Sequence, residues 1–173
     1  MAARAGMGEA MATASDREPR QDAGRPASCC NGRVAHQAMT PREAFAAIAL
    51  VAVACDGSLE RQEATALRQQ LEGRSPYRDL PESVMGDLFD QLLEQLRRQG
   101  WQTLLAAAIP VLTPPQQETA LAMAAQLVHC DRVVSSQEQE LLRVMASQLS
   151  LPAERSQQIL DVIALLNRDS LAS

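Results

Sequence analysis

Apolar residues cluster along the chain with spacings typical of helices. From Ala44 to Cys55 the sequence is apolar without a break, which predicts a helix that is buried on all sides. The preceding residues, Thr40 to Glu43, match a capping box in which Thr is the N-cap and Pro takes the first helical position. We therefore expect a central buried helix over about 41–54.

The third helical pattern along the chain is the clearest amphipathic stripe. Four apolar residues recur every four positions and three more flank them: Val84, Leu88, Leu92 and Leu96, with Met85, Phe89 and Leu93. The acids Asp87, Asp90 and Glu94 lie off this stripe, so we expect them to form a solvated face. The pattern predicts a helix that is capped by residues 79–82 and stops at Gly100.

The remaining patterns predict further helices and no strands. Their expected ranges are about 59–71, 101–109, 114–130, 136–149 and 153 onward. In the last of these we expect four residues to face inward: Ile159, Val162, Ile163 and Leu166. No segment shows sustained strand alternation, so the predicted fold class is all-α, with about seven helices.

One unit of this pattern occurs twice. An apolar helix, an acidic turn and a polar-faced helix follow one another in 44–71 and again in 121–145. A single offset of 75 residues aligns position 56 with 131 and position 63 with 138. Nine positions are identical at this offset, so we interpret the chain as an internal duplication of a helix–acidic turn–helix unit.

The composition changes near residue 39. Residues 1–38 are poor in large apolar side chains, which predicts a disordered N-terminal tail. The tail has no continuous apolar segment, so it does not resemble a secretory signal. Met39 stands directly before a helix start and is an alternative first residue. We expect residues 39–173 to form one helical domain.

The charge balance excludes several classes of function. Five of the 16 basic and four of the 21 acidic residues fall in 1–38, which leaves 11 and 17 in the domain. This acidic balance argues against binding nucleic acid or anionic lipid. The longest apolar run has 12 residues, whereas a bilayer needs about 20. We expect a soluble, cytoplasmic protein that is not inserted in a membrane.

The cysteines and histidines give little support for chemistry. Cys55 and Cys130 end apolar helices, so we expect inert thiols rather than a redox pair. The His129-Cys130-Asp131 triplet lacks the usual ligand spacing of zinc sites. There is no Gly-rich phosphate loop and no nucleophile motif. The sequence favours a protein that is not an enzyme, with no catalytic residues and no organic cofactor.

The two acidic turns are the candidate site. Each unit places an Asp seven residues before a Glu that lies in the first turn of a helix. If the two units pack about a local two-fold axis, Asp56, Glu63, Asp131 and Glu138 converge and provide ligands for a calcium- or magnesium-like divalent ion. The alternative is structural, because Glu138 suits position N3 of a capping box that begins at Ser135.

These residues also suggest a family. The sequence from Asp56 to Glu63 resembles the DG-x-[I/L/V]-x-x-x-E signature of TerB-like tellurite-resistance proteins. Residues 130–138 look like the second copy of that signature, although Arg132 stands where the signature has Gly. The resemblance covers about 39–167. It implies a seven-helix cytoplasmic bundle with an acidic, metal-associated surface, related to a domain of membrane-bound DnaJ-type co-chaperones.

Two functions follow as expectations. The resemblance implies a bacterial stress or tellurite-resistance protein that binds a divalent metal through the paired acidic turns and acts with a protein partner. Tellurite itself is an anion, which a cluster of carboxylates repels. The alternative is a metal-free helical interaction module. In that case the acids are helix caps, and a groove beside the third or the last helix takes a partner.

Overall fold

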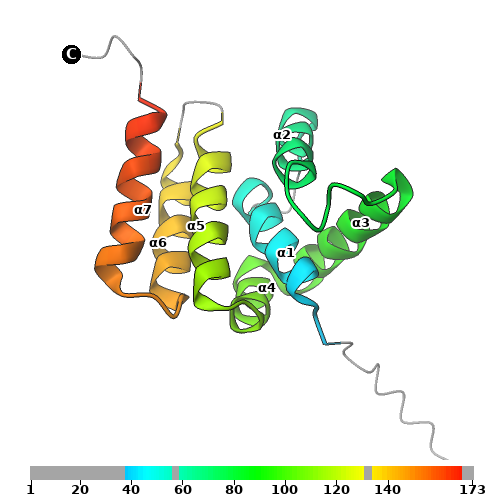
Figure 1. Ribbon diagram of the computed structural model, residues 1–173, viewed down its shortest axis with the longest axis horizontal. Coiled ribbons are helices and arrows are strands. Elements are labelled where there is room, and N and C mark those ends of the chain that lie inside the picture. Colours follow the sequence, from blue (N-terminus) through cyan, green and yellow to red (C-terminus); the bar gives the residue numbers. More distant parts are fainter. Residues whose placement is uncertain (1–37, 56–58, 131–133, 169–173) are drawn as a thin grey trace, which may run out of the picture. The chain divides into compact units, whose positions relative to one another are not determined.

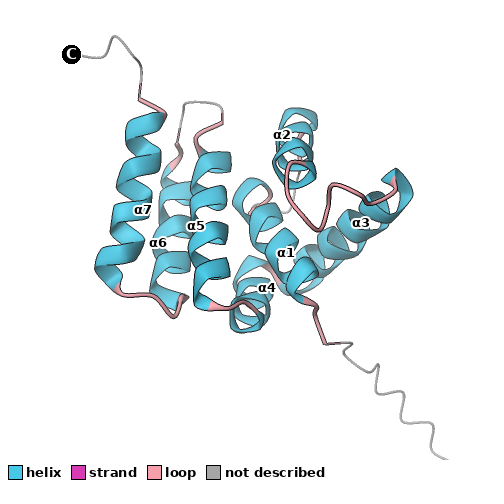
Figure 2. Ribbon diagram, in the orientation of Figure 1, coloured by secondary structure: helices cyan, strands magenta, loops and turns pink. Residues whose placement is uncertain are grey.

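The computed structural model describes residues 38–55, 59–130 and 134–168 (Figure 1). These ranges form seven α-helices and one short 3-10 helix, and they contain no strand (Figure 2), so the all-α prediction is confirmed. The elements are α1 (Pro41–Val53), α2 (Arg61–Glu72), α3 (Glu82–Gln99), α4 (Trp101–Ala108), η1 (Ile109–Val111), α5 (Pro114–Val128), α6 (Ser136–Gln148) and α7 (Ala153–Leu166). The predicted N-terminal tail lies almost wholly outside the described residues.

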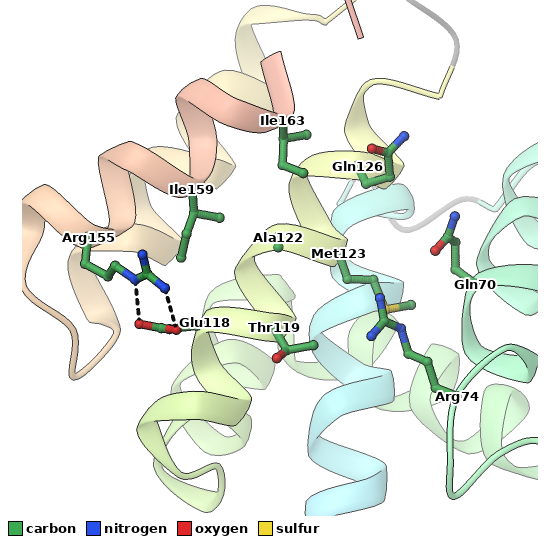
Figure 3. Close-up of a pocket in the computed structure, with 10 residues that line it drawn as sticks. All are labelled: Gln70, Arg74, Glu118, Thr119, Ala122, Met123, Gln126, Arg155, Ile159 and Ile163. Atoms are coloured by element: carbon green, nitrogen blue, oxygen red, sulfur yellow. Dashed lines mark hydrogen bonds and ion pairs between the residues drawn. The ribbon is translucent and has the colours of Figure 1, made fainter. Parts of the chain in front are cut away.

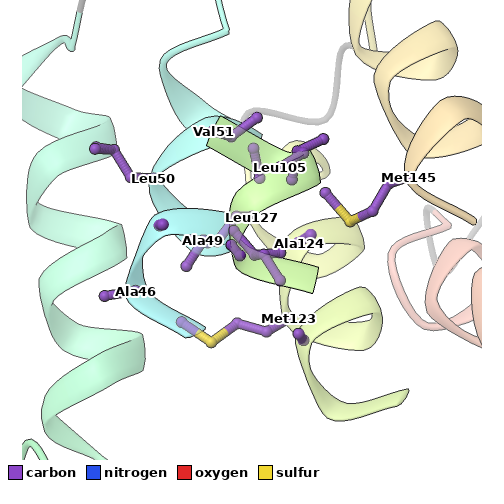
Figure 4. Close-up of a cluster of buried hydrophobic side chains, with 14 of the residues drawn as sticks. Ala46, Ala49, Leu50, Val51, Leu105, Met123, Ala124, Leu127 and Met145 are labelled. Atoms are coloured by element: carbon purple, nitrogen blue, oxygen red, sulfur yellow. The ribbon is translucent and has the colours of Figure 1, made fainter. Parts of the chain in front are cut away.

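Helix α1 is the centre of the fold. Every residue from Ala46 to Ala52 is buried, and the helix contacts α2, α3, α4, α5 and α6. Its five buried alanines in 44–52 let neighbouring backbones approach closely, while larger side chains such as Leu105 and Met123 fill the space around it (Figure 4). The predicted central buried helix is confirmed. It begins with the expected cap, in which Thr40 Oγ1 accepts the Glu43 N–H at 3.3 Å.

Helices α1 and α5 run side by side in the same direction (Figure 1). Each leads through a short turn into a polar-faced helix, α2 or α6. The helix bounds repeat at the offset seen in the sequence: Val53 and Val128 end the first helices, and Arg61 and Ser136 begin the second ones. The repeated pattern thus corresponds to repeated helix bounds, and the duplication itself stays a prediction.

The start of α3 differs from the prediction. The helix begins at Glu82 after Pro81, and no side chain caps it, so the expected capping box at 79–82 is wrong. Val84 is 38% exposed, whereas Met85 takes the inner position. A helix has about 3.6 residues per turn, so a strict spacing of four drifts by about 40° at each step and leaves Val84 at the edge of the stripe. Asp87, Asp90 and Glu94 are exposed, as expected.

Helix α7 lies at the edge of the bundle, against α5 and α6. Ile159 and Ile163 are partly buried against the core, but Val162 is 54% exposed and Leu166 is 71% exposed. The inward placement of these two residues is wrong, because no other described helix covers that face of α7. None of the helices in the described ranges has the length and apolar character needed to cross a bilayer.

Candidate functional site

The two helical hairpins, α1–α2 and α5–α6, meet around a cavity of about 160 Å³, which we call the acidic cavity. It lies at the C-terminal ends of α1 and α5 and at the N-terminal ends of α2 and α6. Its described lining is Val53, Glu60, Gln62, Glu63, Ala66, Leu127, Val128, Cys130 and Glu138. Three carboxylic acids and no basic residue are in this set. The structure therefore brings Glu63 and Glu138, one from each hairpin, to the same cavity.

Both of these glutamates also hold the start of a helix. Glu63 Oε2 accepts the N–H of Glu60 at 2.8 Å, and Glu138 Oε2 accepts the N–H of Ser135 at 2.7 Å. Ser135 Oγ in turn accepts the Glu138 N–H at 3.2 Å, which completes the predicted capping box of α6. The structural role expected as the alternative is thus present at both sites.

Capping and cation binding are compatible for a carboxylate. An ionised carboxylate has two oxygens with roughly four acceptor positions, so accepting a cap N–H does not by itself exclude a contact with a cation. The caps also fix where the two carboxylates lie, because each is tied to the main chain at the first turn of its helix. The caps thus hold two carboxylates, one from each hairpin, at the edge of one cavity.

The two aspartates of the predicted site, Asp56 and Asp131, lie outside the described residues. By sequence, Asp131 directly follows Cys130, which lines the acidic cavity, and Asp56 follows Cys55 at the end of the corresponding hairpin helix. Within the described ranges, no three His, Cys, Asp or Glu residues are grouped closely enough to hold a metal ion. The described part thus supplies two placed carboxylates, and a full ligand set requires the turns.

His129 and Cys130 end α5 beside the cavity. The Nδ1 atom of His129 lies 2.8 Å from the carbonyl oxygen of Ala125, one turn earlier, so this nitrogen carries the proton that it donates to its own helix. Cys130 is exposed, although it follows an apolar helix. No other histidine lies in the described residues, so a zinc site with two histidines is excluded there.

A larger groove of about 420 Å³ lies between α2, α5 and α7 (Figure 3). Ala122 and Met123 of α5 and Ile159 and Ile163 of α7 provide its apolar lining. At one end, Arg155 Nε of α7 donates to Glu118 Oε1 of α5 at 2.8 Å, and this hydrogen bond lowers the pKa of Glu118. A groove beside the last helix is therefore present, as the interaction-module hypothesis requires.

Comparison with known proteins identifies the family. A family model described as "Tellurite resistance protein TerB" matches residues 42–161, which is more than half of the chain. The matched span runs from the first turn of α1 into α7 and includes both acidic turns. No curated protein and no solved structure matches the chain. The chain belongs to the TerB family of tellurite resistance proteins.

Proposed function

We propose that this protein is a non-enzymatic bacterial stress protein of the tellurite-resistance type that binds a divalent cation in the acidic cavity. The proposed ligands are Asp56, Glu63, Asp131 and Glu138. The observation that carries the proposal is that Glu63 and Glu138 line one cavity whose described lining contains no basic residue. Carboxylate oxygens suit calcium, magnesium and manganese, which favour hard oxygen ligands.

The negative charge of the cavity comes from its carboxylic acids. The cavity lies at the C-terminal ends of α1 and α5 and at the N-terminal ends of α2 and α6, so the helix dipoles oppose one another and the acids set the field. The same field repels tellurite, which is an anion. A protective role in this proposal therefore runs through the cation or through a protein partner, and not through direct capture of tellurite by these acids.

Cation binding is expected to stabilise the fold. The two glutamates come from different hairpins, so a shared cation binds the folded chain better than the unfolded one. At a concentration of about 100 times the Kd, such binding adds about 2.7 kcal/mol to the free energy of unfolding. The test is the melting temperature of the full chain with calcium, magnesium, manganese or zinc, against a chelator. We expect at least one of the first three to raise it.

Two double variants assign the effect to the cavity. In Glu63→Gln/Glu138→Gln the side-chain oxygen still caps both helices, because Gln116 already accepts the Thr113 N–H at 2.9 Å in the same way at the start of α5. We expect these substitutions, and Asp56→Asn/Asp131→Asn, to abolish the shift. The matched control is Asp87→Asn/Asp90→Asn on the exposed face of α3. We expect this variant to keep the rise in melting temperature.

The result that contradicts the proposal is simple to state. Either no divalent ion changes the melting temperature, or the shift is the same in wild type and in both cavity variants. A third result also contradicts it: the rise in melting temperature is lost only in Asp87→Asn/Asp90→Asn. The ion then binds to surface charge on α3 and not in the acidic cavity.

A metal-free interaction module is the second candidate, and α7 supports it. Val162, Leu165 and Leu166 are 54%, 59% and 71% exposed, and their spacing of three and four residues places them on one side of that helix. Val162 lines a hollow together with Ile159 and Ile163, which also line the groove of Figure 3. Under this proposal the wild-type protein binds its protein partner even with chelator present, and Asp56→Asn/Asp131→Asn binds it as well. Val162→Ser/Leu166→Ser is expected to lose the partner. Capture that requires the metal or the aspartates favours the cation proposal instead.

A further inference from the structure

A second cavity of about 410 Å³ lies at the N-terminal ends of α1 and α5, away from the acidic cavity. Its lining comes from the first turns of these two helices, from Leu112 just before α5, and from the loop that joins α2 to α3. Apolar side chains form much of the wall: Pro41, Phe45, Pro76, Leu112 and Pro115. Cavities of about 300–1,000 Å³ are the usual size for small organic ligands. We call this the basic cavity.

Two arginines supply the charge of this cavity, and no acid is in its lining. Arg42 comes from α1 and Arg74 from the α2–α3 loop, and neither forms an ion pair with another residue that the structure describes. The acids nearest to these arginines along the chain are held elsewhere: Glu43 Oε2 accepts the Thr40 N–H at 2.7 Å, and Glu72 is paired with Arg68. Arg74 also lines the groove of Figure 3, where Glu118 is paired with Arg155. Both arginines are therefore available to an anion.

Aromatic side chains hold this arrangement in place. The guanidinium carbon of Arg74 lies 6.0 Å from the centre of the Phe45 ring, within cation–π range. Tyr77 is buried, and its hydroxyl donates to the main-chain oxygen of Arg42 at 2.6 Å. This hydrogen bond ties the α2–α3 loop to the first turn of α1, so the main chain that carries each arginine is held beside the same cavity.

Tyr77 adds no negative charge to the cavity at neutral pH. Burial raises the pKa of its phenol well above the ordinary value, although the charges of Arg42 and Arg74 both act to lower it. Arg42 and Arg74 both line this cavity, and no acid does. The field inside is therefore positive, in a protein whose overall charge is negative.

We propose that the basic cavity binds a small organic carboxylate with a flat apolar body. A guanidinium group matches the planar carboxylate with two parallel hydrogen bonds, and Arg42 and Arg74 offer two such groups. The proline, leucine and phenylalanine walls cover the apolar body. An inorganic oxyanion reaches the arginines but leaves these walls uncovered. This site is separate from the acidic cavity and does not depend on the function proposed above.

The test is a titration of the full chain with naphthoate, followed by the amide resonances in NMR spectra at constant ionic strength. We expect saturable shifts at residues 42–45, 74–75, 77 and 116–119. The uncharged naphthamide has the same shape, and we expect it to bind at least about tenfold more weakly, because it cannot form the charged hydrogen bonds. Inorganic phosphate and tellurite serve as anions without an apolar body, and we expect both to bind more weakly than naphthoate.

Substitutions locate the ligand. Arg42→Gln and Arg74→Gln are each expected to weaken naphthoate binding about tenfold. Neither removes the hydrogen bond of Tyr77, since the acceptor is the main-chain oxygen at position 42. Arg97→Gln, on the exposed face of α3, is the control and leaves binding unchanged.

Three results overturn the proposal. They are equal binding of naphthamide, undiminished binding in both cavity variants, and phosphate or tellurite binding as tightly as naphthoate. Repeating the titration with chelator separates this site from the acidic cavity, because loss of a bound cation is expected to leave naphthoate binding unchanged.

Discussion

The two ends of the α1–α5 pair have opposite chemistry. At the C-terminal ends, three carboxylic acids and no base line the acidic cavity. At the N-terminal ends, two arginines and no acid line the basic cavity. The two helices have 13 and 15 residues, so at about 1.5 Å per residue the two cavities are roughly 20 Å apart.

The difference lies in the side chains that the two ends of a parallel helix pair carry. The dipoles of α1 and α5 add, but at the acidic end the N-terminal ends of α2 and α6 oppose them, so the side chains set the charge there. The two arginines lie at the N-terminal end of the pair and the proposed cation ligands at the C-terminal end. The packing between them is mostly apolar, with Gln117 of α5 as a buried polar residue, and this one core positions both sites.

The largest expected effect comes from weakening that core. Ile48→Ala removes a fully buried side chain in the middle of α1, and we expect it to lower the free energy of unfolding by about 2–5 kcal/mol through the cavity that it leaves. Both ligand sites are expected to weaken together, since α1 contributes to each. Chemical denaturation measures the loss. Val84→Ala, at a 38% exposed position on α3, is the control and is expected to cost much less. Equal costs contradict the account.

At the acidic end, Ser135→Ala separates capping from binding. Loss of the Ser135 Oγ acceptor is expected to cost about 0.5–2 kcal/mol of folding free energy in the absence of metal. Glu138→Gln keeps an oxygen for the Ser135 N–H and is expected to cost less, yet it removes the effect of the cation. If Glu138→Gln destabilises the metal-free protein as much as Ser135→Ala does, the charge of Glu138 serves the helix rather than a ligand.

At the basic end, Tyr77→Phe removes the hydrogen bond to the Arg42 carbonyl oxygen, and we expect a loss of about 0.5–1.5 kcal/mol. The pKa of Tyr77 is raised in the folded state, so its contribution is complete below the unfolded value of about 10 and declines as pH rises toward the folded value. Tyr77 is the one tyrosine of the chain, so phenolate absorbance reports it directly. If the Tyr77 phenol of the native protein titrates at its ordinary pKa of about 10, it is neither buried nor hydrogen-bonded as described.

The smallest effect is expected at the exposed edge between α5 and α7. Arg155→Gln removes the ion pair with Glu118, which lies in solvent-accessible surroundings. Such pairs contribute little after screening, so we expect denaturation curves at low and high salt that overlay those of wild type. A clear loss of stability that disappears at high salt means that this pair, rather than apolar contact, holds α7 to the bundle.

Local signals in the sequence were sufficient for most of the fold. The start of α1 was predictable because its capping box and its apolar run lie within a few residues of each other. The start of α3 was not, since Asp79 and Pro81 offer two starting positions and only the neighbouring loop decides between them. The inner face of α7 was also misjudged, because the spacing of Val162 and Leu166 shows a stripe but not whether another helix covers it.

The candidate site was predictable only in part. The repeated spacing indicated Glu63 and Glu138, and their meeting at one cavity depends on how α1 packs against α5, which no local pattern encodes. Asp56 and Asp131 fall outside the described residues. No pattern in the sequence predicted the basic cavity. Its residues Arg42, Arg74 and Thr119 come from three distant segments that only the folded chain brings together.

The most direct test of the central claim maps where a cation binds. Manganese suits carboxylate sites and broadens the NMR signals of nearby amides. The account predicts selective broadening at Val53, Leu127, Val128 and the first turns of α2 and α6, with Arg42 and Thr119 unaffected at the opposite helix ends. Broadening that instead follows the exposed acids of α3, or that is unchanged in Glu63→Gln/Glu138→Gln, would contradict it.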